Sequence, residues 1–217
     1  MCSLEVSRLA DLDAVTFDAN GTLVRLVDPV PELMRVLGER GIDRPASSIR
    51  RAFEAEGRIY AARAVEAHRP AAFTTLQREC TGVFLEELDV NAIDPGEFAP
   101  LYVKAMRFEL LPGARESLER LRRCGLELAI VANFDLSLAA RLEELGLGHA
   151  FSVVVTPADA GVAKPAARIF ELALERLAVA PERALHIGDG AADEEGAAAA
   201  GMKFAWAPIP QALEGWA

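Results

Sequence analysis

The sequence predicts an α/β fold, in which a doubly wound parallel sheet has an all-helical domain inserted after its first strand. Three observations support this prediction. Residues 14–17 form a short apolar run, residues 29–107 carry helical signals, and from Pro112 onward helices and strands alternate. Strands separated by helices are typical of a parallel sheet covered on both faces, so the first and third segments are expected to form one Rossmann-like core.

The composition is that of a folded globular protein. Of the 217 residues, 52% are apolar and 26% are charged, which allows one domain of ordinary size with a sizeable insertion. The formal net charge of -10 disfavours nucleic-acid binding, because phosphate backbones are bound through clustered Lys and Arg side chains. An anionic substrate would therefore need local positive groups.

The first element is a buried strand that leads into a tight turn. Residues 14–17 (AVTF) end at Asp18, and the stretch Asn20, Gly21 and Thr22 then interrupts the apolar pattern. Asn followed by Gly is a strong turn signal, because both residues tolerate a positive φ.

The second element is a block of helices. Its first helix has four apolar residues on one face: Val30, Leu33, Met34 and Leu37. Three prolines stand where further helices can begin: Pro45, Pro70 and Pro95. We expect residues 28–107 to form a helical cap over a core made of residues 1–27 and 108–217, because both of its connections leave from the same edge of the sheet.

In the third segment, from Pro112 onward, helices and strands alternate. It begins with a helix whose apolar positions are Ala114, Leu118 and Leu121 and which closes at Gly125. The expected strands are residues 126–132, 151–155, 184–188 and 203–207. His186 lies between apolar neighbours in one of these strands and is expected to be a packed core imidazole.

Cysteine usage and the first residues indicate the compartment. Cys2, Cys80 and Cys124 are odd in number and widely spaced, so neither a disulfide framework nor a zinc site is predicted. The first fifteen residues mix charged and apolar side chains, which argues against a signal peptide or a membrane span. We expect a cytoplasmic protein without membrane contact.

Polar residues follow four of the predicted strands, where the crevice of such sheets lies. They are Asp18, Asn133, Lys164, and the pair Asp189 and Asp193. Each has a structural explanation when taken singly, because Asp and Asn are common turn and helix-capping residues and a lysine before proline is often a surface residue. Taken together, four such positions in chain order indicate one catalytic site.

The arrangement resembles the haloacid dehalogenase superfamily over essentially the whole chain. The sequence DANGT (residues 18–22) is similar to its first motif, DxDGT, and IVAN (130–133) is similar to its second. The lysine of VAKP at Lys164 and the sequence GDGAAD (188–193) resemble the third and fourth motifs. A cap after the first motif is typical of the subgroup that includes phosphoglycolate phosphatases. The stretches NFD and AKPAARIF are closest to the human "haloacid dehalogenase-like hydrolase domain-containing" proteins.

The resemblance implies a hydrolase of phosphate esters that uses Mg²⁺. Asp18 would be the nucleophile, and Lys164 would offset the phosphate charge. The implied ion ligands are the Asp18 carboxylate, the backbone carbonyl of Asn20 and Asp189, with Asp193 in or just behind this set. The implied substrate-binding residues are Ala19, Asn20, Ala132, Asn133 and Lys164.

Two positions depart from the pattern of the superfamily. Asn20 stands where a second Asp would protonate the leaving group and later activate water. An amide exchanges no proton near neutral pH, so a contribution of about 10²- to 10⁴-fold is expected to be missing. Ala132 stands where Ser or Thr would donate to the phosphate, which removes a few kcal/mol, roughly, of transition-state stabilisation.

Three interpretations follow from these departures. The protein hydrolyses esters with good leaving groups, such as aryl or acyl phosphates; or it is a 2-haloacid dehalogenase; or it binds a phosphorylated ligand or a partner without catalysis. The first is favoured because most site positions persist, and the retained GDxxxD motif argues against the second. The expected partner is a small phosphorylated metabolite, and the protein is expected to be a monomer or a homodimer.

Overall fold

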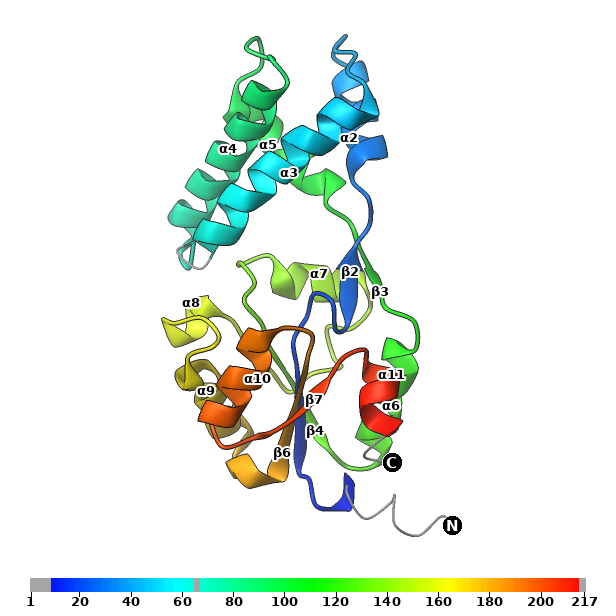
Figure 1. The fold of residues 1–217 in the computed structure, drawn as a ribbon, viewed down its shortest axis with the longest axis vertical. Coiled ribbons are helices and arrows are strands. Elements are labelled where there is room, and N and C mark those ends of the chain that lie inside the picture. Colours follow the sequence, from blue (N-terminus) through cyan, green and yellow to red (C-terminus); the bar gives the residue numbers. More distant parts are fainter. Residues whose placement is uncertain (1–8, 65–66, 215–217) are drawn as a thin grey trace. The chain divides into compact units, whose positions relative to one another are not determined.

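The computed structural model describes residues 9–64 and 67–214 (Figure 1). The chain divides into two compact units, one made of Met1–Arg25 with Glu109–Ala217 and the other of Leu26–Phe108. Cys2 and most of the segment that was considered for a signal peptide lie outside the described residues. Within residues 9–64 and 67–214, no helix has the length and apolar character needed to cross a membrane.

In the described part of the chain, the first unit is built on five parallel strands. They are β1 (Ala14–Phe17), β4 (Glu127–Val131), β5 (Val153–Val155), β6 (Ala184–Gly188) and β7 (Lys203–Trp206). Their order in the sheet is β5-β4-β1-β6-β7, so β1 is the central strand. The register pairs Phe17 with Ile130 on one side and with Ile187 on the other. The carboxyl ends of β1, β4 and β6 are therefore level, and the predicted parallel sheet is confirmed.

Helices cover both faces of this sheet (Figure 1). On one face lie α9 (Ala167–Leu177) and α10 (Ala191–Ala199), and on the other lie α6 (Ala114–Arg123) and α11 (Ile209–Glu214). Ile169 and Phe170 of α9 are fully buried against Val131 and Val155 of the sheet. The central strands are buried along almost their whole length, which is why their sequences are apolar runs without alternation. Shorter helical segments occupy the remaining connections: α7 (Leu138–Glu144), α8 (Pro157–Ala160) and η2 (Pro181–Arg183).

In its described residues, 26–64 and 67–108, the second unit contains four α-helices. They are α2 (Val30–Gly38), α3 (Ala46–Arg63), α4 (Pro70–Glu87) and α5 (Pro95–Ala105). All three prolines stand at helix starts as predicted: Pro45 is the N-cap of α3, and Pro70 and Pro95 are the first residues of α4 and α5, where the fixed φ of proline suits the first turn and its missing N–H group is not needed. One residue of the predicted apolar face is wrong: Met34 is 39% exposed, and Val36 is buried instead. The buried stripe of α2 turns toward Val36 because it packs against both α3 and α5.

Two short strands join the units, and the sequence did not predict them. They are β2 (Val24–Leu26) and β3 (Phe108–Leu110), which pair in a two-stranded sheet. Hydrogen bonds extend this ribbon at both ends, from the Val27 N–H group to the Arg107 carbonyl and from the Leu111 N–H group to the Leu23 carbonyl. Three residues are too few to show a period of two, so this pairing is visible only in the folded chain.

The second unit contains a buried carboxyl group. Glu56 of α3 is 6% exposed and accepts a hydrogen bond of 2.9 Å from the hydroxyl group of Tyr102 in α5. Burial raises the pKa of Glu56, and the hydrogen bond from Tyr102 only partly opposes this shift. Because the folded-state pKa lies above the unfolded value of 4.5, the contribution of Glu56 to stability is complete below that value. It is lost as the pH rises through the folded-state pKa.

Glu56→Gln is expected to remove this pH dependence. The amide keeps an oxygen that accepts from Tyr102 and cannot ionise. We expect urea unfolding to give similar free energies for the variant and the wild type at about pH 4.5 and a more stable variant at about pH 8. The matched control is Glu54→Gln, which changes an exposed carboxylate of the same helix. A difference between Glu56→Gln and the wild type that does not vary with pH would contradict the assignment.

Candidate active site

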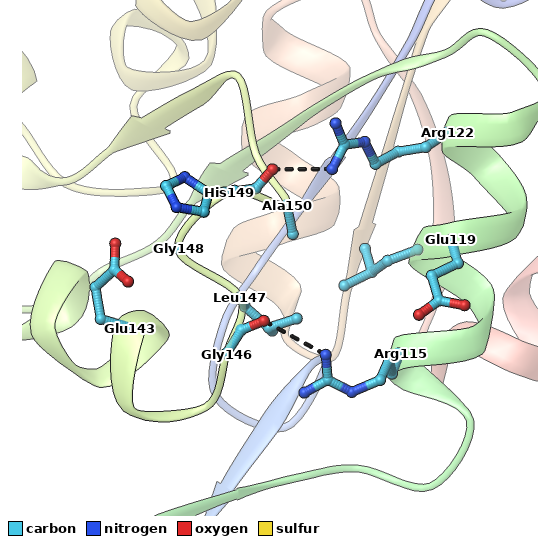
Figure 2. A pocket seen from close by; sticks show the side chains of 10 residues that line it. Arg115, Glu119, Arg122, Glu143, Gly146, Leu147, Gly148, His149 and Ala150 are labelled. Carbon is cyan, nitrogen blue, oxygen red and sulfur yellow. Dashed lines mark hydrogen bonds between the residues drawn. The ribbon is translucent and has the colours of Figure 1, made fainter.

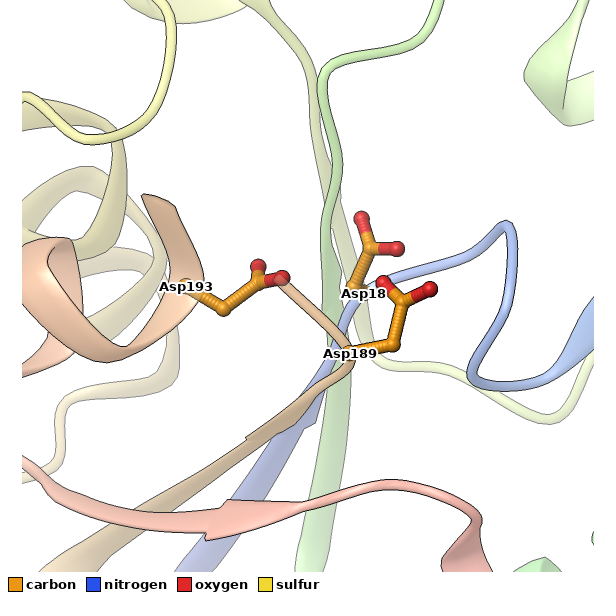
Figure 3. Close-up of side chains that lie close together, drawn as sticks. All are labelled: Asp18, Asp189 and Asp193. Atoms are coloured by element: carbon orange, nitrogen blue, oxygen red, sulfur yellow. The ribbon is translucent and has the colours of Figure 1, made fainter. Parts of the chain in front are cut away.

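Three carboxylates converge where the strands of the first unit end (Figure 3). Asp18 follows β1, Asp189 follows β6, and Asp193 lies in the first turn of α10. One oxygen atom of each lies within 4.8 Å of the others. Figure 3 shows the three side chains close together, with Asp193 reaching toward Asp18 and Asp189. The level ends of β1 and β6 produce this convergence.

Two glycines make room for two of these carboxylates. A Cβ atom at Gly21 would lie 1.9 Å from Oδ2 of Asp189, and Gly21 also has a φ of +84°. A Cβ atom at Gly188 would lie 2.3 Å from Cγ of Asp193. Each contact is much shorter than van der Waals distance. The glycines of the first and fourth motifs are thus needed for the close approach of Asp189 and Asp193.

Lys164 is buried among the carboxylates. Its Nζ atom donates to Oδ1 of Asp18 at 2.5 Å and to Oδ1 of Asp193 at 2.6 Å. The lysine side chain is only 4% exposed, and those of Asp18 and Asp193 are 11% and 5% exposed. The ammonium group therefore compensates two carboxylates that are largely removed from water.

Asn133, at the end of β4, holds the backbone of Lys164. Its side-chain oxygen accepts from the Lys164 N–H group at 2.8 Å, and its side-chain nitrogen donates to the Lys164 carbonyl at 3.0 Å. Both ends of the amide are engaged by these two bonds. A direct role of Asn133 in substrate binding stays a prediction, while its contribution to the position of Lys164 follows from the geometry.

The remaining predicted positions are two alanines and Asn20. Ala19 is 1% exposed, and its carbonyl oxygen accepts from the N–H groups of Leu23 and Val24, which closes the turn after β1. Asn20 is exposed on this turn. Ala132 is 1% exposed and donates its N–H group to Val155. The side chain of Ala132 is a buried methyl group that offers no hydrogen bond.

The three aspartates have different pKa values because their surroundings differ. Burial raises the pKa of Asp18 to about 6, although the Lys164 charge opposes this shift. Burial also acts on Asp193, but hydrogen bonds from His186 and Lys164 outweigh it and lower the pKa of Asp193 to about 2. The pKa of Asp189 is raised by partial burial and by the charge of Asp193.

This group of residues fits a divalent cation. When ionised, the three carboxylates carry three negative charges, and the nearby ammonium group of Lys164 balances one of them. The donors are carboxylate oxygens, which Mg²⁺ prefers over nitrogen or sulfur. Burial is the main cause of the raised pKa of Asp18, and the charge of Asp193 adds to it, so a cation at this place would favour the ionised form.

Sequence reasoning missed a hydrogen-bonded neighbour of the site. His186 is fully buried and packs edge-on against Phe170, so its prediction as a core imidazole is confirmed. Its ring also contacts Oδ1 of Asp193 at 3.1 Å and Oγ1 of Thr16 at 2.7 Å. One sequence signal could have revealed this neighbour: Thr16 and His186 are polar residues in two otherwise apolar strands that end at the site.

A separate hollow lies between α6 and the loop before β5 (Figure 2). Its volume is about 270 Å³, and none of the predicted site residues is among those that line it. The guanidinium groups of Arg115 and Arg122 donate to backbone carbonyls of Leu145 at 2.7 Å and His149 at 2.9 Å. These two arginines therefore tie the loop to the helix.

Comparison with known proteins identifies the family of the chain. The family model described as haloacid dehalogenase-like hydrolase matches residues 12–201. Haloacid dehalogenase-like hydrolase domain-containing protein 3 of Xenopus laevis is 44% identical over 85 residues, which cover 39% of this chain and 35% of the relative. The phosphoserine phosphatase of Thermus thermophilus is 39% identical over 136 residues, which cover 58% of this chain and 55% of the relative.

A solved structure agrees over a longer range. A phosphatase of the same superfamily from Thermococcus onnurineus is 26% identical, with a TM-score of 0.57 over 90% of this chain and 86% of its own. The chain spans about half or less of the length of the two curated relatives described above. The matched family model extends over most of the sequence and includes all four motifs. The chain belongs to the haloacid dehalogenase-like hydrolases.

Proposed function

We propose that the protein is a magnesium-dependent phosphatase of small phosphorylated molecules, which acts through an aspartyl-phosphate on Asp18. One observation carries this proposal: the Asp18 carboxylate is held at 2.5 Å from the Lys164 ammonium group and within 4.8 Å of two further carboxylates. An aspartate that was buried only for structural reasons would not need an ammonium group and two further carboxylates beside it. The phosphatase names of relatives, including phosphoserine phosphatase, support the same class of reaction.

In the proposed reaction, Asp18 acts as the nucleophile. One carboxylate oxygen forms a bond to phosphorus, and the bond between phosphorus and the leaving oxygen breaks, so that oxygen departs with the electron pair. Water then attacks the aspartyl-phosphate, which releases phosphate and restores the carboxylate. Asp18 directly follows a central buried strand, which holds its backbone in a fixed position for this attack.

Lys164 supplies positive charge to the phosphoryl group. An ammonium group has three N–H donors, and Asp18 and Asp193 accept from two of them. The third is available for a phosphoryl oxygen. A donor in a buried site stabilises developing charge more than the same donor in water does.

Asp18, Asp189 and the backbone carbonyl of Asn20 would hold Mg²⁺, with Asp193 behind them. The bonds that Asp193 accepts from Lys164 and Gly190 favour this outer place. When bound, the ion would neutralise phosphate charge and orient the phosphoryl group. The excess of carboxylates over ammonium groups at the site supports such a countercharge.

The substrate class follows from two missing groups. No proton donor stands at Asn20, and no hydroxyl donor stands at Ala132. An alkyl leaving group needs a proton as it departs, whereas an aryl or acyl leaving group is stable as an anion. Aryl and acyl phosphates are therefore the favoured substrates. The same two departures favour, as a second candidate, a protein that binds a phosphorylated ligand without turnover.

Hydrolysis of an aryl phosphate distinguishes the two candidates. We expect phosphate release that requires Mg²⁺ and is lost in Asp18→Asn, because the amide is not a nucleophile. Asp43→Asn is the matched control, since Asp43 is an exposed residue of the other unit. Binding of a phosphorylated ligand without any release of phosphate would overturn the phosphatase in favour of the binding protein.

A further inference from the structure

A chain of buried hydrogen bonds leads away from the site into the core. Thr16 of β1 and His186 of β6 are adjacent in the sheet register, and their side chains are joined by the contact of 2.7 Å between Oγ1 and Nδ1. The other ring nitrogen of His186 meets Oδ1 of Asp193 at 3.1 Å. Thr16 and His186 are fully buried, and Asp193 is 3% exposed.

The chemistry of these groups determines the direction of each hydrogen bond. Both oxygens of Asp193 accept hydrogen bonds, Oδ1 from the Lys164 ammonium group and Oδ2 from the Gly190 N–H group, so Asp193 acts as an acceptor and Nε2 of His186 carries the proton of their contact. The imidazole is fully buried, which disfavours a charged ring, so with the proton on Nε2 the Nδ1 atom carries none. Thr16 therefore donates to Nδ1. Only one tautomer of His186 satisfies both neighbours.

The packing around His186 gives its ring one orientation. Phe170 of α9 meets the imidazole edge-on, with ring centroids 4.9 Å apart and an interplanar angle of 89°. Phe204 of β7 lies near the ring, at 6.3 Å between centroids. A Cβ atom at Gly196 would lie 2.2 Å from Phe170, so this glycine permits the close packing. Rotation of the imidazole would require these neighbours to move.

Asp193 is in turn held at both of its oxygens. Oδ1 accepts from His186 and from Lys164, and Oδ2 accepts from the Gly190 N–H group at 3.1 Å. These bonds leave Asp193 little freedom, and Lys164 is bound to the same oxygen as His186. A change at His186 is thus transmitted to Lys164 through one shared acceptor atom.

We propose that His186 is a positioning residue of this site: as the Nε2–H tautomer fixed by Thr16, it holds Asp193 and, through Asp193, holds Lys164 against Asp18. The effect on phosphoryl binding rests on the function proposed above. The tautomer itself does not depend on that function, and each part has its own experiment.

The tautomer is tested on the ¹⁵N-labelled wild-type protein. Long-range ¹H–¹⁵N correlation spectra at neutral pH are expected to show His186 with a protonated Nε2 and a bare Nδ1. His186→Gln identifies the signals by their disappearance. A ring protonated at Nδ1, or at both nitrogens, would overturn the proposal.

The positioning role is tested by binding of fluoroberyllate in the presence of Mg²⁺, followed by ¹⁹F NMR. Fluoroberyllate imitates a phosphoryl group on an aspartate and needs no turnover. His186→Phe keeps an aromatic ring without the N–H donor and is expected to weaken binding by about 10- to 100-fold. His186→Gln, which retains an N–H donor, is expected to recover part of this loss.

A double-mutant cycle separates positioning from general structural damage. In a Lys164→Met background, His186→Phe is expected to have little further effect, because its influence passes through Lys164. An equal weakening in both backgrounds, or none in either, would overturn the proposal. If His186→Phe does not fold, fluoroberyllate binding is compared between Thr16→Val and Thr16→Ser, because only the second variant keeps the hydroxyl group. Equal binding by these two variants would overturn the proposal.

The outcomes distinguish the two proposals. A wild-type protein that neither binds fluoroberyllate nor releases phosphate refutes the proposed phosphatase, and the spectrum of His186 then still decides its tautomer. Wild-type binding that His186→Phe leaves unchanged refutes the positioning role alone.

Discussion

Asn20→Asp is expected to raise kcat/KM for an alkyl phosphate by about 10²- to 10⁴-fold, because it introduces the missing general acid and base. Asn20 is exposed on the turn after β1, so a carboxyl group there is solvated and meets no steric obstacle. The gain is expected to be much smaller for an aryl phosphate with a good leaving group, since that oxygen departs without a proton. The measurement is the gain in kcat/KM for the alkyl phosphate divided by the gain for the aryl phosphate.

The second step of the reaction gives a further readout of the same change. Without a base at position 20, hydrolysis of the aspartyl-phosphate is slow, so wild type is expected to release a burst of about one equivalent of the phenol before a slow steady state. Asn20→Asp should abolish the burst. Intact mass confirms that the wild-type sample retains its amide, because Asn20 precedes Gly21 and such pairs deamidate. Equal gains in kcat/KM for alkyl and aryl substrates would contradict an acid catalyst.

Lys164→Met is expected to lower the free energy of unfolding by about 3–5 kcal/mol, since it leaves two buried carboxylates without their countercharge. The deficit should grow as the pH rises through about 6. Burial already raises the folded-state pKa of Asp18 to about 6, above its unfolded value of 3.8, so ionisation of Asp18 in this range costs stability. Loss of the ammonium group raises that pKa further. Mg²⁺ is expected to restore part of the stability by supplying a countercharge.

An exposed ion pair of the same unit provides the control for Lys164→Met. The guanidinium group of Arg183 donates to Asp13 at 2.6 Å, and the two side chains are 45% and 46% exposed. Arg183→Met is expected to change the free energy of unfolding much less than Lys164→Met does, because solvent screens the exposed pair. Urea unfolding of both variants with and without Mg²⁺ makes the comparison. Equal losses would show that Lys164 is no more coupled to its partners than a surface residue is.

Much of the sheet was predictable because each central strand is buried on both faces. β1 was expected at residues 14–17 and β6 at 184–188, and the structure has the same bounds. The strand expected at 151–155 is shorter, since β5 begins only at Val153. The pairing of β2 with β3 could not be predicted, because two segments of three residues, about 80 positions apart, carry no periodic signal.

The site was predictable in its residue types and only partly in its contacts. The first and fourth motifs indicated the three aspartates, and the register of β1 and β6 places their oxygens within 4.8 Å. The sequence did not indicate that the Asn133 amide binds the backbone of Lys164. It also did not indicate that Asp193 accepts from His186. Such contacts depend on side-chain directions across neighbouring strands, which a one-dimensional pattern does not contain.

The sequence by itself determined the α/β class, the helical insertion and the chemical groups available for catalysis, because apolar periodicity and residue type are local properties. Tertiary structure alone decided that one ammonium group serves two carboxylates and that a core histidine supports one of them. The reason is electrostatic: the pKa values of Asp18 and Asp193 move in opposite directions, to about 6 and about 2, although both are aspartates beside Lys164. Burial and the number of donors around each oxygen set that difference, and both arise only when distant segments pack together.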